Sequence, residues 1–453
     1  MIEESKLQTI VEKVIDRLKN EGVLQSGGAR SSREPAREKP AAVYSPKYQS
    51  GKFGLFERID DAVKAAWNAH LSLAGQGLAL REKVLQAMRD VTMKINFDLS
   101  KKTVEETGLG RVEDKVVKNK LVVDKTPGVE ILLPKAFTGD HGLTLMERAP
   151  YGVICSITPC TNATETILNN AIGMIAGGNA VVFNPHPSAR NTSIEYIRAM
   201  NEAIVHAGGP DNLMCMIGEP TIESATELMK HKDAKLVVVT GGPAVVKAAM
   251  ALGKKVIGAG PGNPPAVVDE TAHIDKAAKD IIAGASLDNN IVCIVEKEII
   301  AVDAVADKLK EALIRHGAYH LKDTQVSRLE KIIVEDGHPA KKFVGKNVNR
   351  ILETIGVSAS DQVRIAFCEV DESHPFVQLE MLLPVIPFVR VRNVEEAIET
   401  AVRVEHGFRH TAVMHSTNID HLHRMACRVD TSIFVKNAPS FAGLGLGGEG
   451  YTS

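Results

Sequence analysis

Short runs rich in β-branched residues alternate with longer helical patterns through the middle of the chain, and this alternation constrains the fold most. The runs span residues 152–157, 180–183, 235–239 and 265–268, and the helical patterns span 163–176, 188–207, 221–230 and 243–251. Such alternation indicates a parallel sheet covered by helices, because each helix returns the chain to the start of the next strand. A second block follows over about 282–416, with strands expected at 292–302, 363–368 and 385–390. The sequence therefore predicts an α/β protein.

Size and charge exclude several classes of protein. The chain has 453 residues, enough for two to four domains, and its 54 basic and 56 acidic residues give a net charge of −2. This balance argues against a surface for nucleic acid or anionic lipid. We find neither an apolar run long enough to cross a membrane nor a secretory signal. Six cysteines are too few for a disulfide framework, so a reducing compartment is expected.

The pattern of the N-terminal segment predicts an amphipathic helix followed by a flexible linker. Ser, Pro and Gly residues dominate 26–50, which is typical of a linker. The helix could fold back on its own domain or dock on another protein, and the detached position favours docking. Its mixed charges disfavour a membrane surface. The apolar face consists of Leu7, Ile10, Val11, Val14, Ile15 and Leu18.

One cysteine stands out as a candidate nucleophile. Cys293 follows the polar loop 287–290 and stands at the expected start of a strand, where a thiol can meet both a substrate and the backbone N–H groups of a turn. The other five are interpreted as small buried residues: Cys155, Cys160, Cys215, Cys368 and Cys427. His421, His423 and Cys427 are not expected to bind a metal, because positions i and i+2 of a helix point to different faces.

Two polar turns follow predicted parallel strands. At 237–243 a strand leads into Gly241 and Gly242, and Pro243 suits the first position of a helix. A turn of this kind presents N–H groups and the positive end of a helix to a phosphate. The strand 181–183 leads into a second polar loop, 184–187. Ligands of open α/β sheets bind at such carboxyl ends of strands.

Taken in order, these and further segments resemble the aldehyde dehydrogenase superfamily from about Gly51 onward. The segments are 147–153 (ERAPYGV), 158–162 (TPCTN), 178–185 (GNAVVFNP), 240–242 (TGG) and 380–385 (EMLLPV), and Cys293 falls where the family keeps its nucleophile. The resemblance implies that Asn162 stabilises an oxyanion and that Glu380 holds the nicotinamide ribose. It also implies a set of dinucleotide contacts, namely Thr158, Pro159, Asn184, Pro185, His186, Thr240, Gly241 and Gly242.

The resemblance also implies a domain organisation. It predicts an encapsulation-type helix over 1–20, a flexible linker over 21–50, an NAD-binding domain from 51–128 and 151–258, an oligomerisation hairpin over 129–150 and a catalytic domain over 259–453. The expected fold is therefore aldehyde dehydrogenase-like. It combines a Rossmann-type parallel-sheet cofactor domain with a second α/β catalytic domain and a small hairpin.

Two departures from the family pattern narrow the expected chemistry. Ala259 stands where hydrolytic members place a general-base Glu, and without that base water is poorly activated. A thiol needs less help, so release of the acyl group by coenzyme A is favoured. The motifs 258–263 and 288–290 resemble the CoA-acylating branch found in bacterial microcompartments. Asn184 and His186 replace the usual ribose contacts, so NAD is expected from the resemblance while NADP stays open.

The sequence therefore predicts oxidation of propanal or ethanal to acyl-CoA with NAD, through a cysteinyl thioester on Cys293. The alternatives are a hydrolytic aldehyde dehydrogenase, a phosphate-releasing acyl reductase and an inactive recruitment scaffold. Expected partners are a short-chain aldehyde, coenzyme A, and microcompartment shell or cargo proteins that bind residues 1–20. We also expect a homo-oligomer, either a dimer or a tetramer, in the cytoplasm inside a microcompartment.

Overall fold

The computed structural model describes residues 48–452, so the predicted helix over 1–20 and nearly all of the predicted linker over 21–50 lie outside the described residues. Contacts divide the described chain into two compact units. The first contains residues 48–87, 132–159 and 174–260, and the second contains 88–131, 160–173 and 261–452. The division falls within two helices, α3 (Leu78–Thr107) and α5 (Ala163–Ala176).

The first unit is built on a parallel sheet of six strands in the order β1-β6-β5-β4-β7-β8. The chain runs outward from β4 through β5 to β6 and then returns to place β7 on the other side of β4, so a topological switch point lies between β4 and β7. The elements of this unit are β1 (Leu55–Phe56), α2 (Ile59–Ala74), β4 (Val153–Thr158), β5 (Ala180–Pro185), a 3-10 turn (Pro187–Ala189), α6 (Arg190–His206), β6 (Met214–Ile217), α7 (Ile222–Lys230), β7 (Ala234–Thr240), α8 (Pro243–Met250) and β8 (Lys255–Ala259).

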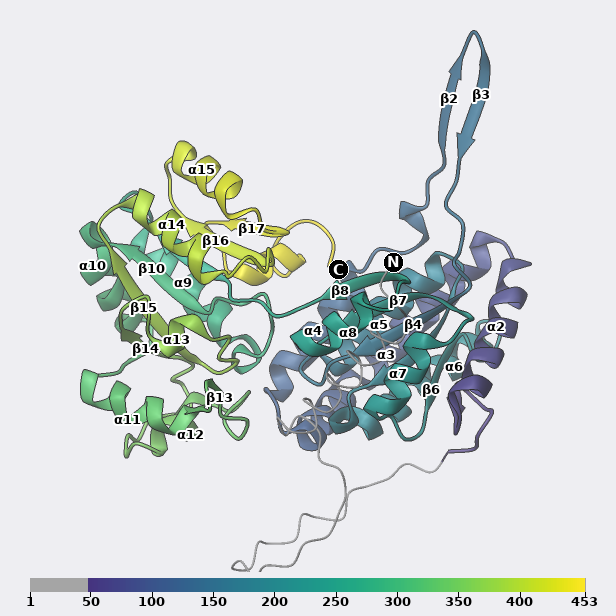
Figure 1. Cartoon of the computed structure of the whole chain (residues 1–453), viewed down its shortest axis with the longest axis horizontal. Coiled ribbons are helices and arrows are strands. Elements are labelled where there is room, and N and C mark those ends of the chain that lie inside the picture. Colours follow the sequence, from purple (N-terminus) through teal and green to yellow (C-terminus); the bar gives the residue numbers. More distant parts are fainter. Residues whose placement is uncertain (1–47, 453) are drawn as a thin grey trace, which may run out of the picture. The chain divides into compact units, whose positions relative to one another are not determined.

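Helices cover this sheet, as Figure 1 shows. Helices α2 and α7 contact each other and pack on the central strands, and α6 packs on β6 and β1. Every residue of β4, β5 and β6 is buried, which explains why these strands read as continuous apolar runs rather than alternating ones. Cys155 and Cys215 are buried within these strands.

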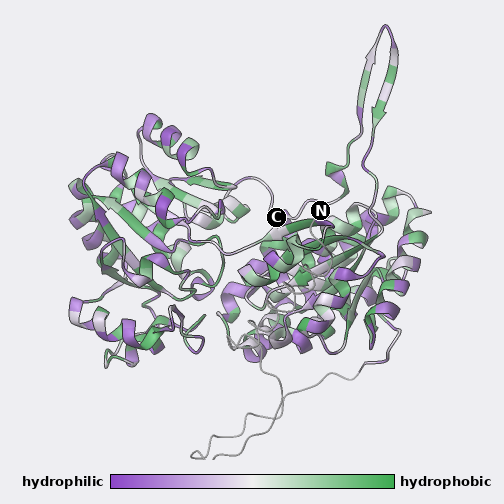
Figure 2. Ribbon diagram, viewed as in Figure 1, coloured by the Kyte–Doolittle hydropathy of each residue, from purple (hydrophilic) through white to green (hydrophobic). Residues whose placement is uncertain are grey.

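A two-stranded antiparallel hairpin leaves the first unit (Figure 1). It consists of β2 (Lys135–Gly139) and β3 (Gly142–Met146), and all ten of its strand residues are exposed. Large apolar side chains lie on it, with Phe137 59% and Leu143 68% exposed, and Figure 2 shows hydrophobic residues along its arms. An isolated hairpin of this kind is marginally stable in water, so its apolar side chains favour a partner surface.

The second unit contains a parallel sheet of seven strands in the order β11-β14-β15-β10-β9-β16-β17. A large apolar core lies between this sheet and its helices. The elements are α4 (Val112–Lys125), β9 (Pro265–Val268), α9 (Ile274–Ser286), β10 (Glu298–Val302), α10 (Asp303–Arg315), β11 (Tyr319–His320), α11 (Asp323–Ile333), β12 (Val334–Glu335), β13 (His338–Pro339), α12 (Val348–Glu353), β14 (Ala366–Glu369), α13 (Pro375–Gln378), β15 (Val385–Val391), α14 (Val394–Val404), β16 (Thr411–His415), α15 (Ile419–Val429) and β17 (Ile433–Lys436), with 3-10 turns at Val129–Ile131, Leu287–Asn290 and Ser440–Leu444.

These two parallel sheets confirm the predicted α/β fold class. The helix predicted over 163–176 and the strand predicted over 265–268 have the expected bounds. One prediction was wrong: the strand expected over 292–302 begins only at Glu298, because residues 291–295 form turns. None of the helices within residues 48–452 is both long enough and apolar enough to span a membrane. The predicted roles of the domains stay predictions.

Candidate active site

Cys293 follows a loop with an unusual backbone. Asp288, Asn289 and Asn290 have φ angles of +49°, +56° and +69°, three left-handed residues in a row. Asp and Asn tolerate this conformation better than other residues with side chains, which explains the composition of the loop. Asn289 Nδ2 donates to Gly345 O at 2.9 Å, and Asn290 Nδ2 donates to Ala285 O at 2.8 Å. The side chains of Asn289 and Asn290 therefore stabilise the turn that precedes Cys293.

Lys297 fixes the other side of this turn. Its buried ammonium donates to Asn290 O at 2.6 Å, to Asn290 Oδ1 at 2.9 Å and to Val292 O at 3.3 Å. Because these carbonyls point at an ammonium rather than at a neighbouring strand, β10 cannot begin before Glu298. Burial lowers the pKa of Lys297 to about 8, while Glu380 and Cys293 oppose that shift.

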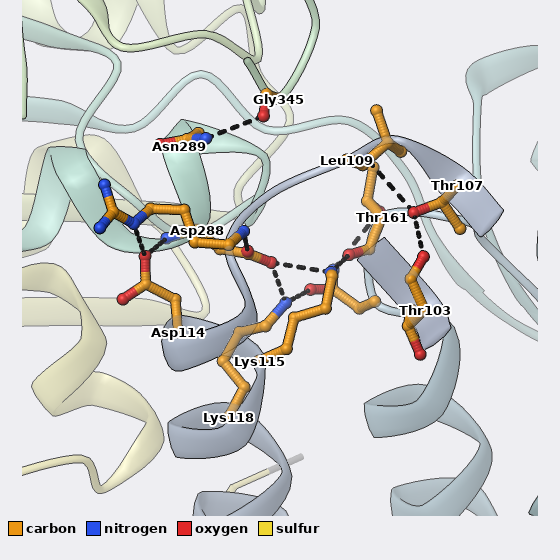
Figure 3. A network of polar contacts seen from close by, with 12 residues as sticks. Thr103, Thr107, Leu109, Asp114, Lys115, Lys118, Thr161, Asp288, Asn289 and Gly345 are labelled. Carbon is orange, nitrogen blue, oxygen red and sulfur yellow. Dashed lines mark hydrogen bonds and ion pairs between the residues drawn. The ribbon is translucent and has the colours of Figure 1, made fainter. Parts of the chain in front are cut away.

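A buried charge network anchors the start of the loop (Figure 3). The fully buried Asp288 carboxylate accepts the Arg111 N–H at 2.8 Å, and its Oδ2 lies 3.0 Å from Lys115 Nζ and 2.7 Å from Lys118 Nζ. Burial alone would raise the pKa of Asp288, but the two lysines outweigh it and hold the pKa below its usual value. Gly110 is required here, because its φ is +76° and a Cβ would lie 1.9 Å from Asp288 Oδ1.

The same network reaches Asn162 at the start of α5. Lys118 Nζ donates to Asn162 Oδ1 at 2.7 Å and forms an ion pair with Glu165 Oε1 at 2.9 Å. Asn162 O accepts the Thr166 N–H at 3.0 Å, so Asn162 begins the helix. Burial would lower the pKa of Lys118, but Asp288 and Glu165 raise it above the usual lysine value. The sequence-predicted residues Asn162 and Cys293 thus belong to the same unit, and a buried lysine links their surroundings.

The Cys293 thiol is protonated at neutral pH. Burial, reinforced by the Glu380 carboxylate, raises the pKa of Cys293 to about 11, while Lys297 and Lys118 oppose the shift. Deprotonation therefore has to accompany substrate binding or attack.

Three further groups lie beside the thiol-bearing loop. Gly262 N donates to Glu380 Oε1 at 3.4 Å. A Cβ added at Gly262 would lie 2.7 Å from Cys293 O and 3.1 Å from the His410 ring, so only glycine allows these segments to approach. Burial, followed by the charge of Lys297, lowers the pKa of His410, and its imidazole is neutral at pH 7. No sequence pattern signals that His410 lies here, because it is more than a hundred residues from Cys293 along the chain.

The remaining cysteines are less suited to chemistry. Burial raises the pKa values of Cys155, Cys160, Cys215 and Cys368, and three of these are fully buried as predicted. The prediction of a buried Cys427 was wrong, because this residue lies on the exposed face of α15. His421 accompanies Asp269 and Glu270 in a cluster whose atoms could hold a cation. However, Asp269 already accepts hydrogen bonds from Thr271 and Ser416, so it has little capacity left for a metal.

The dinucleotide residues predicted in the first unit lie at one edge of the six-stranded sheet. The parallel register pairs Thr158 with Pro185 and Ile157 with Val239, so the carboxyl ends of β4, β5 and β7 meet beside the switch point. Gly242 caps α8, and Pro243 occupies the first turn of that helix as predicted. A strand edge with a helix N-terminus is where α/β sheets bind nucleotides.

The carboxyl edge of the six-stranded sheet leaves room for a ligand to approach the backbone closely. A Cβ at Gly241 or Gly242 would meet nothing within 4 Å, and the buried Thr158 Oγ1 has no hydrogen-bond partner among the described residues. Asn184, in contrast, is buried and bonded to the start of α7, through Thr221 O at 3.2 Å and Ser224 Oγ at 2.6 Å.

His186 and the neighbouring prolines complete this edge. His186 Nδ1 accepts the Ser188 N–H at 3.1 Å, and burial lowers the pKa of His186. Pro159 is half-buried after β4, while Pro185 ends β5 and is buried. Thr240 ends β7, and Ala259 ends the edge strand β8 with its carbonyl accepting the Gly241 N–H at 3.2 Å. The dinucleotide contacts of this set stay predictions.

Comparison with known proteins agrees with this geometry. The aldehyde dehydrogenase family matches residues 11–324. An acetylating acetaldehyde dehydrogenase, EutE of Salmonella typhimurium (strain LT2), is 48% identical over 409 residues, covering 89% of this chain and 87% of the relative. Rhodopseudomonas palustris propionaldehyde dehydrogenase, solved with bound CoA and an acylated cysteine, is 48% identical with a TM-score of 0.87 over 88% of this chain and 92% of that one.

A third relative comes from a microcompartment. It is the propionaldehyde dehydrogenase of the Clostridium phytofermentans fucose utilisation bacterial microcompartment, 44% identical with a TM-score of 0.87 over 88% of this chain and 92% of that one. The family match covers well over half of the chain, and the two solved relatives share both sequence and fold along most of their length. The chain therefore belongs to the aldehyde dehydrogenase family, within its CoA-acylating acetaldehyde and propanal dehydrogenases.

Proposed function

We propose that this protein oxidises a short aliphatic aldehyde, propanal or ethanal, to the corresponding acyl-CoA with NAD as the electron acceptor. The observation that carries the proposal is the 48% identity to a propionaldehyde dehydrogenase solved with CoA and an acylated cysteine. Ala259 supports it, because a methyl group cannot activate water for hydrolysis. NADP remains the alternative dinucleotide.

In the first step, the Cys293 sulfur attacks the aldehyde carbon and forms a thiohemiacetal. The carbonyl oxygen becomes an oxyanion, which the Asn162 amide and the Cys293 backbone N–H stabilise by hydrogen bonds. The thiol proton has to pass to solvent water as the C–S bond forms, since the pKa of Cys293 is raised to about 11 by burial and by Glu380. Lys297, whose pKa burial lowers to about 8, supplies positive charge beside the forming thiolate.

In the second step, the thiohemiacetal loses hydride and becomes a thioester on Cys293. A bound nicotinamide supplies the hydride acceptor. The turn at Thr240, Gly241 and Gly242, with the N-terminus of α8, would hold the pyrophosphate, and Glu380 would hold the nicotinamide ribose.

In the third step, the CoA thiol attacks the thioester carbonyl. A new C–S bond to CoA forms, the bond to Cys293 breaks, and the enzyme thiolate regains a proton. His410 is the candidate acceptor of the CoA proton, because burial lowers its pKa and leaves a neutral imidazole beside Gly262.

We further propose that the protein assembles as a homo-oligomer inside a bacterial microcompartment. The exposed apolar residues of β2 and β3, among them Phe137 and Leu143, support an interface with a second copy.

Residues 1–20 would bind a shell or cargo protein through their apolar face. Deletion of 1–20 should leave turnover unchanged and abolish co-purification with shell proteins; loss of turnover or folding would contradict this assignment.

The decisive experiment follows NADH formation from propanal and NAD with and without CoA. With CoA, we expect steady turnover and propionyl-CoA in the product. Without CoA, NADH should stop after about one equivalent per active site, because the thioester cannot be released. Cys293→Ala should form no NADH while it still binds NAD. Sustained NADH formation without CoA would indicate hydrolysis instead, and turnover that depends on phosphate would indicate a phosphate-releasing reductase.

A further inference from the structure

The Lys118 side chain lies at the centre of the buried network, and its ammonium contacts three acceptors. Nζ lies 2.7 Å from Asn162 Oδ1, 2.7 Å from Asp288 Oδ2 and 2.9 Å from Glu165 Oε1. An ammonium group carries three N–H donors and no acceptor. One hydrogen bond to Asn162 and two ion pairs to buried carboxylates therefore hold the ammonium in one place.

This contact determines which way the Asn162 amide points. Because the Lys118 ammonium can only donate, the amide atom that faces it has to be the oxygen. The amide NH2 group then points away from Lys118, where it makes only a long contact of 3.5 Å to Thr161 Oγ1. An oxyanion is best stabilised by a donor that is already aimed before the charge develops. The contact with Lys118 therefore fixes the orientation of the Asn162 amide before any charge develops and leaves its NH2 group available as a donor.

Among the described residues, Lys118 contacts both the Asn162 side chain and the Glu165 carboxylate, and the neighbouring Lys115 contacts neither. Both lysines bind the Asp288 carboxylate, at 3.0 Å and 2.7 Å, and both are buried. Lys115 donates its further hydrogen bond to the backbone carbonyl of Thr161 at 3.3 Å, whereas Lys118 donates to the Asn162 side chain. Figure 3 shows Lys115 and Lys118 approaching Asp288 from neighbouring turns of one helix. The chain therefore contains a matched control for the contact to Asn162.

We propose that Lys118 is a positioning residue for the dehydrogenase reaction, which fixes the Asn162 amide with its NH2 group free for the oxyanion and ties it to the loop that precedes Cys293. The inference rests on the proposed function, in which Asn162 stabilises the oxyanion of the thiohemiacetal. Without Lys118 the amide can rotate and present its oxygen, which repels an oxyanion. Removal of Lys118 should therefore weaken stabilisation of the transition state, which lowers kcat, and should leave substrate binding unchanged.

The test is a double-mutant cycle in the full-length enzyme, read as kcat and KM with propanal, NAD and CoA. Asn162→Ala should lower kcat by about 10²–10³-fold. Lys118→Met should lower kcat by roughly 10–100-fold with the KM for propanal unchanged, as expected for an interaction made only in the transition state. In the Asn162→Ala background, Lys118→Met should cost less than about 2-fold, because its target is gone. Equal losses in both backgrounds would overturn the proposal.

Two further variants separate positioning from folding. Lys115→Met removes the same charge from the same carboxylate but keeps the bond to Asn162, so its effect should be the same in both backgrounds. Should Lys118→Met fail to fold, Lys118→Met with Glu165→Gln removes a positive and a negative charge together, and Glu165→Gln alone is its control. Thermal unfolding of every variant identifies losses that arise from instability. Coupling between Lys115 and Asn162 as strong as that of Lys118 would contradict a specific role for Lys118.

The outcomes also separate this inference from the proposed function. If the wild-type enzyme forms no propionyl-CoA, the proposed function is wrong and the role of Lys118 falls with it. If the wild type is active and Asn162→Ala keeps its full rate, the oxyanion role of Asn162 and the positioning role of Lys118 are both wrong, while the activity stands. If Asn162→Ala is slow and the cycle is additive, only the positioning role is wrong.

Discussion

The nucleotide edge of the first unit and the nucleophile loop of the second unit are built in opposite ways. At the edge, a Cβ on Gly241 or Gly242 would meet nothing within 4 Å, and the Thr158 hydroxyl lacks a partner among the described residues. At the loop, Asp288 is fully buried between two lysines, and a Cβ on Gly110 would lie 1.9 Å from its carboxylate. One surface is left open, and the other is closed by its own side chains.

This difference matches what each surface has to do in the proposed reaction. A cofactor that leaves and returns in each cycle needs a stretch of backbone that no side chain covers. A covalent nucleophile and its oxyanion donor stay in place, so their surroundings can be fixed in advance by buried ion pairs. Buried charges are stable only when every partner is present. Substitutions at the loop should therefore lower stability and kcat, whereas substitutions at the edge should mainly affect binding.

The largest effect should come from Asp288→Asn. Asn tolerates the left-handed backbone as Asp does, so the change removes only the charge and leaves Lys115 and Lys118 facing a neutral group. We expect the free energy of unfolding to fall by roughly 3–5 kcal/mol, because breaking a buried ion pair strands its partners. Urea unfolding monitored by circular dichroism measures this loss. The matched control is Asp275→Asn, an exposed carboxylate paired with His316 at 2.8 Å, which should have little effect.

The loss of unfolding free energy in Asp288→Asn should depend on pH in one direction. Burial would raise the pKa of Asp288, but Lys118 and Lys115 hold it below the usual value. A depressed carboxyl pKa stabilises the fold above the unfolded pKa of about 4, and the contribution disappears as the pH falls through the folded value. The stability difference between wild type and Asp288→Asn should therefore be greatest near pH 7 and shrink on acidification. A difference that grows towards low pH would contradict the ion-pair account.

A pair of glycine substitutions tests the open and closed surfaces directly. In Gly262→Ala the new Cβ would lie 2.7 Å from the backbone oxygen of Cys293, so the loop has to move, and kcat should fall roughly 10–100-fold. In Gly242→Ala the Cβ meets nothing, so folding and kcat should be kept, while the KM for NAD rises up to about 10-fold because a methyl group keeps the pyrophosphate from the backbone. Steady-state kinetics with varied NAD separates the two. A fall in kcat with Gly242→Ala as large as with Gly262→Ala would remove the contrast.

The sequence predicted the open surface more fully than the closed one. Strand alternation and a Gly-Gly-Pro turn follow from local patterns, and β4, β5, β7 and the start of α8 lie where those patterns placed them. Lys118, Lys297 and His410 carry no such local signal, because a lysine on an amphipathic helix is expected to face water. The burial of Lys118 depends on a partner more than a hundred residues away, Asp288. The raised pKa of Cys293 escaped prediction for the same reason, since it depends on burial and on Glu380.

The smallest effect should be a change in Cys293 reactivity when the negative charge of Glu380 is removed. Burial and then Glu380 raise the pKa of Cys293 to about 11, while Lys297 and Lys118 lower it. Removing the negative charge in Glu380→Gln should lower this pKa, and below the pKa each unit of decrease raises the thiolate fraction about tenfold. At pH 9 we therefore expect Cys293 to react with iodoacetamide roughly 3- to 10-fold faster in Glu380→Gln than in the wild type.

Mass spectrometry of the modified peptide separates Cys293 from the exposed Cys427, and Cys293→Ala gives the background. The wild-type alkylation rate should still be rising towards pH 11, whereas that of the variant should level off earlier. Slower alkylation in Glu380→Gln would mean that the carboxylate helps to remove the thiol proton and does not merely repel the thiolate. In that case Glu380 would act as a base for Cys293, and the buried surroundings of the thiol would serve proton transfer as well as positioning.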